Sequence, residues 1–391
     1  MGCVIDGCPP GLGLSQADIQ KELLKRRPAQ GAASSARNEA DVPEILSGVF
    51  NNTTLGTPIA IVIRNTNCNP AAYDNLEDIY RSGHADWTYQ AKYGIRDHRG
   101  GGRSSGRETV SRVAAGAVAK IFLAQYGISI NAWVSSIFDI AMPCPGESGF
   151  DCFAKGSYPA LQGEKKGMNP ETNTLPKQHT SSLQDGVVDF NEIWRNPLRL
   201  PCPAYVKQAM EKIEEIRAEG DSCGGVVSCI VTGLPPGLGE PVFDKLDARL
   251  GAAILSIGGC KGIEFGAGFA AAGYKGSKNN DEPIGSEGLP VQGAITPDIP
   301  AIGFKTNNSG GILGGISSGQ QLFFKAAFKP PPSIGKPQKA VDKSGAIREI
   351  TIEGRHDVCI APRAVPVVEA MAALLLADFI LMQRRSGTAV I

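Results

Sequence analysis

The sequence predicts a single α+β domain, spanning residues 1–391, that is built from two related halves. Residues 3–13 read CVIDGCPPGLG and residues 229–239 read CIVTGLPPGLG, so one strand-like segment with a Pro-Pro-Gly turn occurs twice. Each copy precedes a segment with helical periodicity, 15–27 in the first half and 241–256 in the second. The repeated strand–turn–helix unit indicates internal pseudo-symmetry. Other strands and helices are interspersed without strict alternation, which favours an α+β architecture over a doubly wound sheet.

Hydrophobic periodicity predicts the remaining elements in chain order. Residues 57–63 are rich in β-branched side chains and predict a strand. Residues 107–126 place apolar side chains on one helical face, and Gly127 ends this helix. A long loop is expected where Gly, Pro, Asn and Asp are abundant. The other predicted segments are a strand over 128–137, a helix over 205–218, this loop over about 275–311, a strand over 348–353 and a helix over 365–382.

Composition argues against a general binder of nucleic acid or of an anionic membrane. The 39 basic residues equal the 39 acidic ones, so the chain has no net field to attract a polyanion. The apolar C-terminal stretch contains Glu369 and Asp378, which favours a buried amphipathic helix over a membrane span. None of the ten cysteines has the two-residue spacing of a zinc or redox motif. We therefore expect reduced, buried thiols, no metal site and a cytoplasmic protein.

One basic segment indicates an anion-binding site. Residues 81–109 read RSGHADWTYQAKYGIRDHRGGGRSSGRET, with five arginines, one lysine and three consecutive glycines. Glycines let backbone N–H groups approach an anion, and arginines bind phosphate or carboxylate in a bidentate manner. The predicted helix that follows adds the positive end of its dipole. The segment taken alone is equally consistent with a solvated or RNA-contacting basic loop, although it lacks interleaved stacking aromatics.

Several segments in the same order resemble the chorismate synthase family along essentially the whole chain. They are SGVFNNTTLGTPIAI at 47–61, RSGHAD at 81–86, KYGIRD at 92–97, RGGGRSSGRE at 99–108, GGILGGISSGQ at 310–320, GRHD at 354–357 and RAVPVVEAM at 363–371. The resemblance implies a sandwich of two antiparallel sheets with helices, built from two related halves. It also implies a homotetramer and a lyase that eliminates phosphate from 5-enolpyruvylshikimate 3-phosphate to give chorismate. The implied cofactor is reduced FMN, although the reaction has no net redox change.

The resemblance also implies roles for individual residues. His84 matches a histidine beside the flavin, and Asp357 matches an aspartate that helps to remove the ring proton. The residues that match substrate-binding arginines are Arg26, Arg81, Arg107 and Arg355. The residues that match the FMN site are Arg103, Ser104, Ser105, Gly258, Gly259, Gly314, Lys329, Pro330, Pro331, Pro332, Ser333 and Arg355. No motif assigns an NADPH-dependent flavin reductase activity.

The family opens with a Gly-Glu-Ser-His-Gly motif that precedes the position of Met1 and supplies a second catalytic histidine. This motif is absent from the sequence, and its four histidines stand at other positions. The first copy of the repeat also begins in the middle of its strand. We therefore expect that the extreme N-terminal segment is missing. Two alternatives stay open: a non-catalytic FMN- or phosphate-binding protein on the same scaffold, and a basic-loop nucleic-acid binder.

Overall fold

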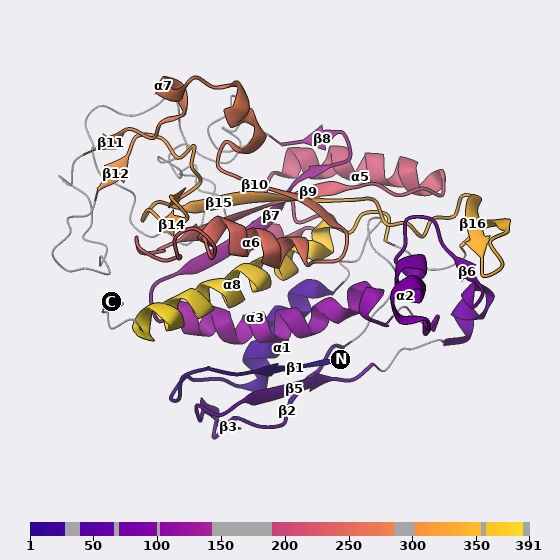
Figure 1. Cartoon of the computed structure of the whole chain (residues 1–391), viewed down its shortest axis with the longest axis horizontal. Coiled ribbons are helices and arrows are strands. Elements are labelled where there is room, and N and C mark those ends of the chain that lie inside the picture. The colour runs from indigo at the N-terminus through magenta and orange to yellow at the C-terminus, as the bar shows by residue number, and fades with distance from the viewer. Residues whose placement is uncertain are drawn as a thin grey trace.

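The computed structural model describes residues 1–27, 40–65, 70–99, 102–142, 190–284, 302–352 and 357–385. Within these residues, two antiparallel sheets lie on opposite sides of a layer of helices (Figure 1). Helix α3 contacts strands β1 and β5 of one sheet, whereas helix α8 contacts strands β7 and β9 of the other. The predicted α+β sandwich of two antiparallel sheets and helices is therefore confirmed.

The two sheets share the same strand order over three strands. The smaller sheet has the order β1-β5-β2, formed by β1 (Gly2–Ile5), β5 (Ile59–Ile63) and β2 (Pro43–Ile45). The larger sheet has the order β10-β15-β9-β7-β8, formed by β10 (Cys260–Phe265), β15 (Leu322–Phe328), β9 (Gly225–Thr232), β7 (Ser129–Ile137) and β8 (Ile140–Ala141). Strands β1, β5 and β2 therefore correspond to β9, β15 and β10. This agreement confirms the internal pseudo-symmetry that the repeat predicts.

The repeated Pro-Pro-Gly turns make matching hydrogen bonds in both halves. In the first half, the Thr54 hydroxyl donates to the Pro9 carbonyl at 2.6 Å and accepts from the Leu12 N–H at 3.0 Å. In the second half, the Ser317 hydroxyl donates to the Pro235 carbonyl at 2.6 Å and accepts from the Leu238 N–H at 2.9 Å. Each hydroxyl satisfies backbone groups that the turn leaves without a strand partner. In each half, the hydroxyl that holds the turn therefore comes from a short hairpin. The hairpin of the first half pairs β3 (Val49–Phe50) with β4 (Thr53–Thr54), and that of the second half pairs β13 (Ile312–Leu313) with β14 (Ile316–Ser317).

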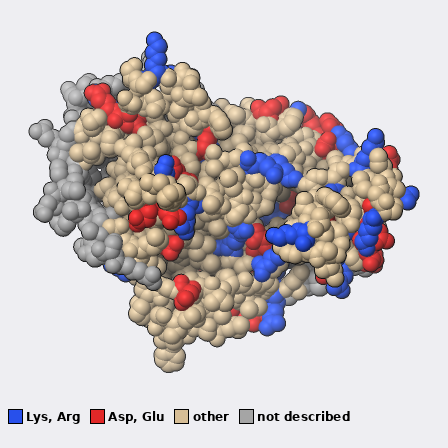
Figure 2. All heavy atoms as spheres, in the orientation of Figure 1, with Lys and Arg blue, Asp and Glu red and all other residues tan. Residues whose placement is uncertain are grey.

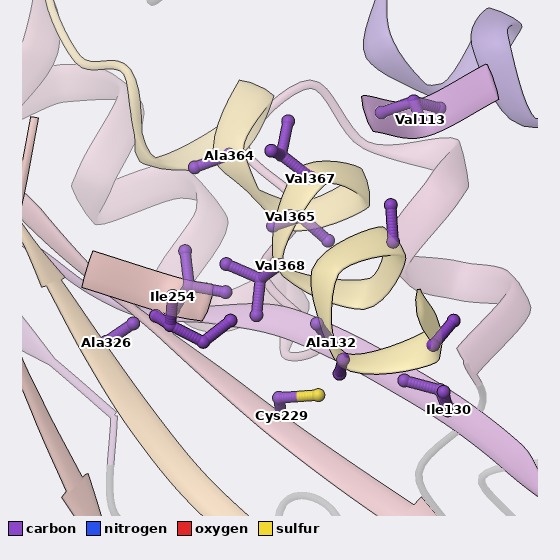
Figure 3. Close-up of a cluster of buried hydrophobic side chains, with 14 of the residues drawn as sticks. Val113, Ile130, Ala132, Cys229, Ile254, Ala326, Ala364, Val365, Val367 and Val368 are labelled. Atoms are coloured by element: carbon purple, nitrogen blue, oxygen red, sulfur yellow. The ribbon is translucent and has the colours of Figure 1, made fainter. Parts of the chain in front are cut away.

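The helices between the sheets bury the main hydrophobic core. They are α1 (Gln16–Arg26), α3 (Thr109–Ala124), α6 (Leu246–Leu255) and α8 (Ala361–Arg385). Helix α1 begins with a capping box between Ser15 and Asp18, which satisfies otherwise free N–H groups at its first turn. Figure 3 shows Val365 and Val368 of α8 gathered with Ile254 of α6 and Cys229 of β9, all of them buried. Helix α8 therefore packs apolar side chains against both a neighbouring helix and the larger sheet.

Helices α3 and α8 pack closely at Gly116, where a built Cβ would collide with the Ala370 side chain and lie 2.6 Å from its Cα. We expect Gly116→Ala to destabilise the protein by about 1–3 kcal/mol, because overpacking outweighs the better helix propensity of alanine. Gly251→Ala in α6 is a matched control, since its Cβ would meet only Ile263 at 3.9 Å. That variant should be neutral, or more stable by up to about 1 kcal/mol. Denaturant unfolding measures both, and equal effects would contradict the steric argument.

A polar network crosses the helix layer. The Lys120 ammonium of α3 donates to Glu22 of α1 at 2.6 Å and to Glu369 of α8 at 2.5 Å. The other Glu369 oxygen accepts the Ala132 N–H of β7 at 2.9 Å. Burial disfavours the charged ammonium, but the two carboxylates offset this and raise the pKa of Lys120 to about 12. The network therefore satisfies the buried Glu369 carboxylate of α8.

Among the residues that the structure describes, α8 alone has the length and apolar composition of a membrane span. Most of that helix is buried inside the protein against α3, α6, β7 and β9. It is therefore a core helix, as the charged residues within it predict. Glu369 is 2% exposed, so its burial depends on the hydrogen bonds described above.

The remaining elements surround this sandwich. They are η1 (Pro70–Leu76), α2 (Asp86–Tyr93), η2 (Gly102–Ser104), η3 (Gly106–Glu108), α4 (Phe190–Arg195), α5 (Pro203–Ala218), η7 (Gly268–Gly273) and α7 (Gly276–Asn279). A third sheet has the order β17-β16-β6, formed by β17 (Ile347–Ile350), β16 (Gln338–Asp342) and β6 (Ile79–Tyr80). A short hairpin pairs β11 (Pro283–Ile284) with β12 (Gly303–Phe304).

Two element predictions need correction. The helix predicted over 241–256 begins only at Leu246, because the preceding residues form an irregular turn in which Val242 has a φ of +69°. The predicted loop over about 275–311 contains α7, β11 and β12 in its described part. These elements are short, so their glycine- and asparagine-rich sequence gives no periodic signal. All seven cysteines in the described part of the chain are free, and no metal-binding cluster occurs among these residues.

Candidate active site

Two arginines predicted to bind substrate share one buried carboxylate. Arg26 ends helix α1, and its Nη1 donates to Asp41 Oδ2 at 3.1 Å. Arg107 lies in η3, and its Nη1 donates to Asp41 Oδ1 at 2.6 Å. The Arg26 guanidinium also reaches the Thr109 hydroxyl at 2.9 Å and the Gly106 carbonyl at 2.9 Å. Asp41 therefore holds both guanidinium groups at the first turn of α3, where the helix dipole favours an anion.

A second carboxylate organises the segment that contains His84. Asp86 begins α2, and its Oδ1 lies 2.8 Å from the His84 Nδ1. Arg81 donates to the same carboxylate through Nε at 2.7 Å and Nη2 at 3.0 Å, and Arg96 through Nη1 at 3.0 Å. Burial would raise the pKa of Asp86, but hydrogen bonds and positive charge from His84 and Arg81 hold it well below its usual range. Asp86 is thus an ionised carboxylate that pairs with His84, Arg81 and Arg96.

Lys329 joins the His84 segment to two predicted FMN-binding segments. Its Nζ donates to the Gly83 carbonyl at 2.6 Å, and its backbone N–H donates to the Gly259 carbonyl at 2.9 Å. A Cβ built on Gly83 would lie 3.1 Å from the Pro332 Cβ, so these two segments are in contact. The structure therefore brings Gly258, Gly259 and residues 329–332 beside His84.

Arg112 connects the start of α3 to the same place. Its Nη1 donates to the Ser256 hydroxyl at 2.6 Å and its Nη2 to the Ser256 carbonyl at 3.0 Å. Ser256 follows α6 and stands two residues before Gly258. The Arg112 Nε also donates to Glu108 at 2.9 Å, one helical turn earlier. The first turn of α3 and the end of α6 are therefore adjacent.

Asp357 lies just before α8, where its Oδ2 accepts from the Arg363 Nη1 at 2.6 Å. Three residues later, Ile360 comes so near Gly259 that a Cβ on that glycine would be 2.8 Å from the Ile360 Cδ1. Gly259 has a φ of +87°, a conformation that favours glycine. In Figure 1 the ends of α3 and α8 nearest α2 lie side by side, and Figure 2 shows Lys and Arg side chains gathered over this region. Asp357 therefore lies three residues before Ile360, whose side chain is close to Gly259.

The other predicted site residues differ in their placement. Ser105 caps η3 by accepting the Arg107 N–H at 3.3 Å, Ser104 and Ser333 are half-buried, and Arg103 is exposed. Gly314 stands apart: its neighbour Gly315 accepts the N–H of Leu246, at the opposite end of α6 from Gly259. A ten-residue helix is about 15 Å long, so this chain's own contacts do not bring Gly314 to the rest of the site. Arg355 lies outside the described residues.

Sequence reasoning missed four residues of this site. Arg96 lies within the basic run, and Asp86 within the His-Ala-Asp motif, but neither was assigned a role. Arg112 carried a local signal, since it is four residues after Glu108 on a predicted helix. Asp41 carried none, because its partners stand 15 and 66 residues away in the chain. Contacts between distant parts of the chain decide the positions of Asp41 and Arg112, whose partners stand up to 66 and 144 residues away, whereas Asp86 and Arg96 pair within one segment.

Comparisons with known proteins identify the family. The family described as chorismate synthase matches residues 1–381. Chorismate synthase of Maridesulfovibrio salexigens is 48% identical over 99% of this chain and 94% of its own length. That of Syntrophus aciditrophicus is 46% identical over 98% of this chain and 93% of its own length. A crystal structure of chorismate synthase matches 97% of this chain and 88% of its own, with a TM-score of 0.67 and 30% identity. A family match over nearly the whole length, together with the same fold, shows that the chain belongs to the chorismate synthase family.

Proposed function

We propose that the clustered basic and acidic residues at one end of the helix layer form the active site for a phosphate-eliminating lyase reaction. The substrate would be 5-enolpyruvylshikimate 3-phosphate and the product chorismate. The observation that carries this proposal is that Arg26 and Arg107 share Asp41 at the first turn of α3, while Arg81 and His84 share Asp86 next to the contact of Lys329 with Gly83. The substrate carries a phosphate and two carboxylates, and each charge-assisted hydrogen bond contributes roughly 1.5–3 kcal/mol. A dense arginine set matches this charge pattern.

The residues beside His84 fit a flavin mononucleotide. A Cβ built on Gly258 would meet nothing within 4 Å, so a flat ring can approach the backbone there. Lys329, Ser104 and Ser105 supply an ammonium and hydroxyl groups, which suit a phosphate or the polar edge of a ring. When bound, reduced FMN supplies transient electron donation to the substrate as phosphate leaves. The cofactor of the proposed site is therefore reduced FMN, held by these residues.

The proposed roles of His84 and Asp357 follow from their surroundings. His84 has its Nδ1 at the Asp86 carboxylate, where an imidazolium would present a positive charge towards the flavin site. Asp357 is the carboxylate that accepts the ring proton of the substrate. Its Oδ2 is oriented by the Arg363 guanidinium at the start of α8.

Chorismate formation tests the proposal. The protein is incubated anaerobically with excess reduced FMN and purified 5-enolpyruvylshikimate 3-phosphate, and chorismate and phosphate are both measured. Equal release of the two products is expected. Binding of reduced FMN without turnover would instead support a flavin-binding protein without this activity. A parallel aerobic assay with NADPH and oxidised FMN tests whether the protein also reduces its own flavin.

We further propose a homotetramer in the cytoplasm, in which the smaller sheet forms an interface. Val4 of β1 is opposite Ala60 of β5, and it is 71% exposed. The corresponding pair in the larger sheet, Ile230 and Phe323, is 0% and 4% exposed. Trp133 lies over that pair, its ring 6.3 Å from that of Phe323. The smaller sheet therefore exposes an apolar side chain at a position whose equivalent in the larger sheet is buried. This difference supports the proposal that a second copy of the chain covers the smaller sheet.

Val4→Asp is expected to convert the tetramer into smaller species, because a carboxylate would be desolvated at the interface. Light scattering after size-exclusion chromatography measures the mass. Ile347→Asp is the matched control, since Ile347 is a strand residue with 69% exposure on the separate third sheet. A Val4→Asp protein with unchanged mass would contradict the proposed interface.

A further inference from the structure

Asp86 is buried beneath the proposed active site and receives hydrogen bonds from three cationic or titratable side chains. Its side chain is 2% exposed, and those of Arg81, Arg96 and His84 are 7%, 7% and 15% exposed. Its Oδ2 also accepts the Arg81 backbone N–H at 3.2 Å. The carboxylate thus makes five contacts, and three of them come from Arg81. A group satisfied in this way has one strongly preferred orientation.

The neighbouring charges show why the carboxylate is needed. Arg81 Nη2 is 3.0 Å from the His84 Nδ1, so a protonated imidazole would face a guanidinium directly. Arg96 adds a second positive charge through the shared Asp86 oxygen. The Lys329 ammonium contacts the Gly83 carbonyl, one residue before His84, and contributes a third. Without Asp86, these like charges would disfavour the proton on His84.

We propose that Asp86 is a positioning residue for the lyase reaction, which fixes the His84 ring by its Nδ1 and supplies the counter-charge to that ring among three cations. The inference rests on the proposed function of His84. The Nε2 atom of the same ring lies 3.2 Å from the Arg81 Nη2. The second role of Asp86 is to orient the Arg81 guanidinium, which donates to both carboxylate oxygens. The oriented guanidinium can then face an anionic group of the substrate.

Asp86→Asn tests this inference because it keeps the shape and removes the charge. We expect kcat/KM to fall about 100-fold or more, as for other losses of an orienting carboxylate or charge at an active site. The limb of the pH profile that depends on the His84 ring should move to lower pH, because the ring loses its counter-charge. Nitrogen NMR of the histidine rings, assigned with His84→Ala, should show the same shift without substrate.

Asp97→Asn is the matched control. Asp97 lies eleven residues after Asp86 and also pairs with an arginine, Arg99, but its side chain is 60% exposed. Its pH profile and NMR midpoints should equal those of the wild type. Asp86→Glu keeps the charge, so it should restore part of the activity and the wild-type midpoint in the pH profile and in the NMR titration. This variant serves as the test if Asp86→Asn does not fold. A variant with lower thermal stability but an unchanged midpoint would show a merely structural role and overturn the inference. Failure of the wild type to make chorismate would instead count against the proposed function.

Discussion

Replacing His84 by alanine is expected to lower kcat by roughly 100- to 10,000-fold, the range for loss of an acid–base or charge-stabilising side chain. The ring lies beside Lys329 and the Gly83 turn, where the proposed flavin site and the arginine clusters meet. Substrate should still bind, because Arg26 and Arg107 hold positions set by Asp41 rather than by His84. The change should therefore appear mainly in kcat, with a smaller change in KM.

Single-turnover measurement of chorismate, with reduced FMN in excess, separates this effect from slow product release. His98→Ala provides the comparison, since it removes a histidine from the same basic segment but outside the His84 cluster, and it should retain activity. If His84→Ala turned over within a few-fold of the wild type, the proposed role of this residue would be wrong. If both variants lost activity equally, a general disturbance of the segment would be the explanation.

Removal of the Asp41 carboxylate is expected to produce the largest loss of stability. In Asp41→Ala, the guanidinium groups of Arg26 and Arg107 face each other without the carboxylate that now lies between them. The Arg26 and Asp41 side chains are 4% and 2% exposed, so water cannot screen the remaining charge. Breaking a buried ion pair by removing one partner costs about 3–5 kcal/mol. Urea unfolding should show a decrease of this size in the free energy of unfolding.

The same variant should respond more strongly than the wild type to added phosphate. Two arginines without their carboxylate form a better anion site, so inorganic phosphate should raise the melting temperature of Asp41→Ala more than that of the wild type. Asp78→Ala is the control, because Asp78 forms an exposed pair with Lys343 at 2.6 Å. Its loss should cost no more than about 1 kcal/mol. A comparable cost for both variants, or no added response to phosphate, would refute the proposed role of Asp41.

Much of the fold was predictable because the signals were local. The Pro-Pro-Gly repeat predicted two related halves, and the shared order of β1-β5-β2 and β9-β15-β10 confirms it. The long apolar periodicity of α3 and α8 identified both helices to within a few residues at most ends. The start of α6 was placed too early, since residues 241–245 have helix-compatible composition but form a turn around Val242. Backbone strain of this kind has no periodic signal in a sequence.

The sequence by itself determined which side chains are available for the reaction: the basic run around His84, the glycine-rich segments and the Asp357 motif. Only the tertiary structure decided how they are paired. Asp41 joins Arg26 to Arg107 across 66 residues, and Lys329 reaches Gly83 across 246. Electrostatic energy depends on distance and burial rather than on separation along the chain. The identity of each counter-charge, and with it the protonation and orientation of the active-site groups, therefore emerges only when the two halves pack around the helix layer.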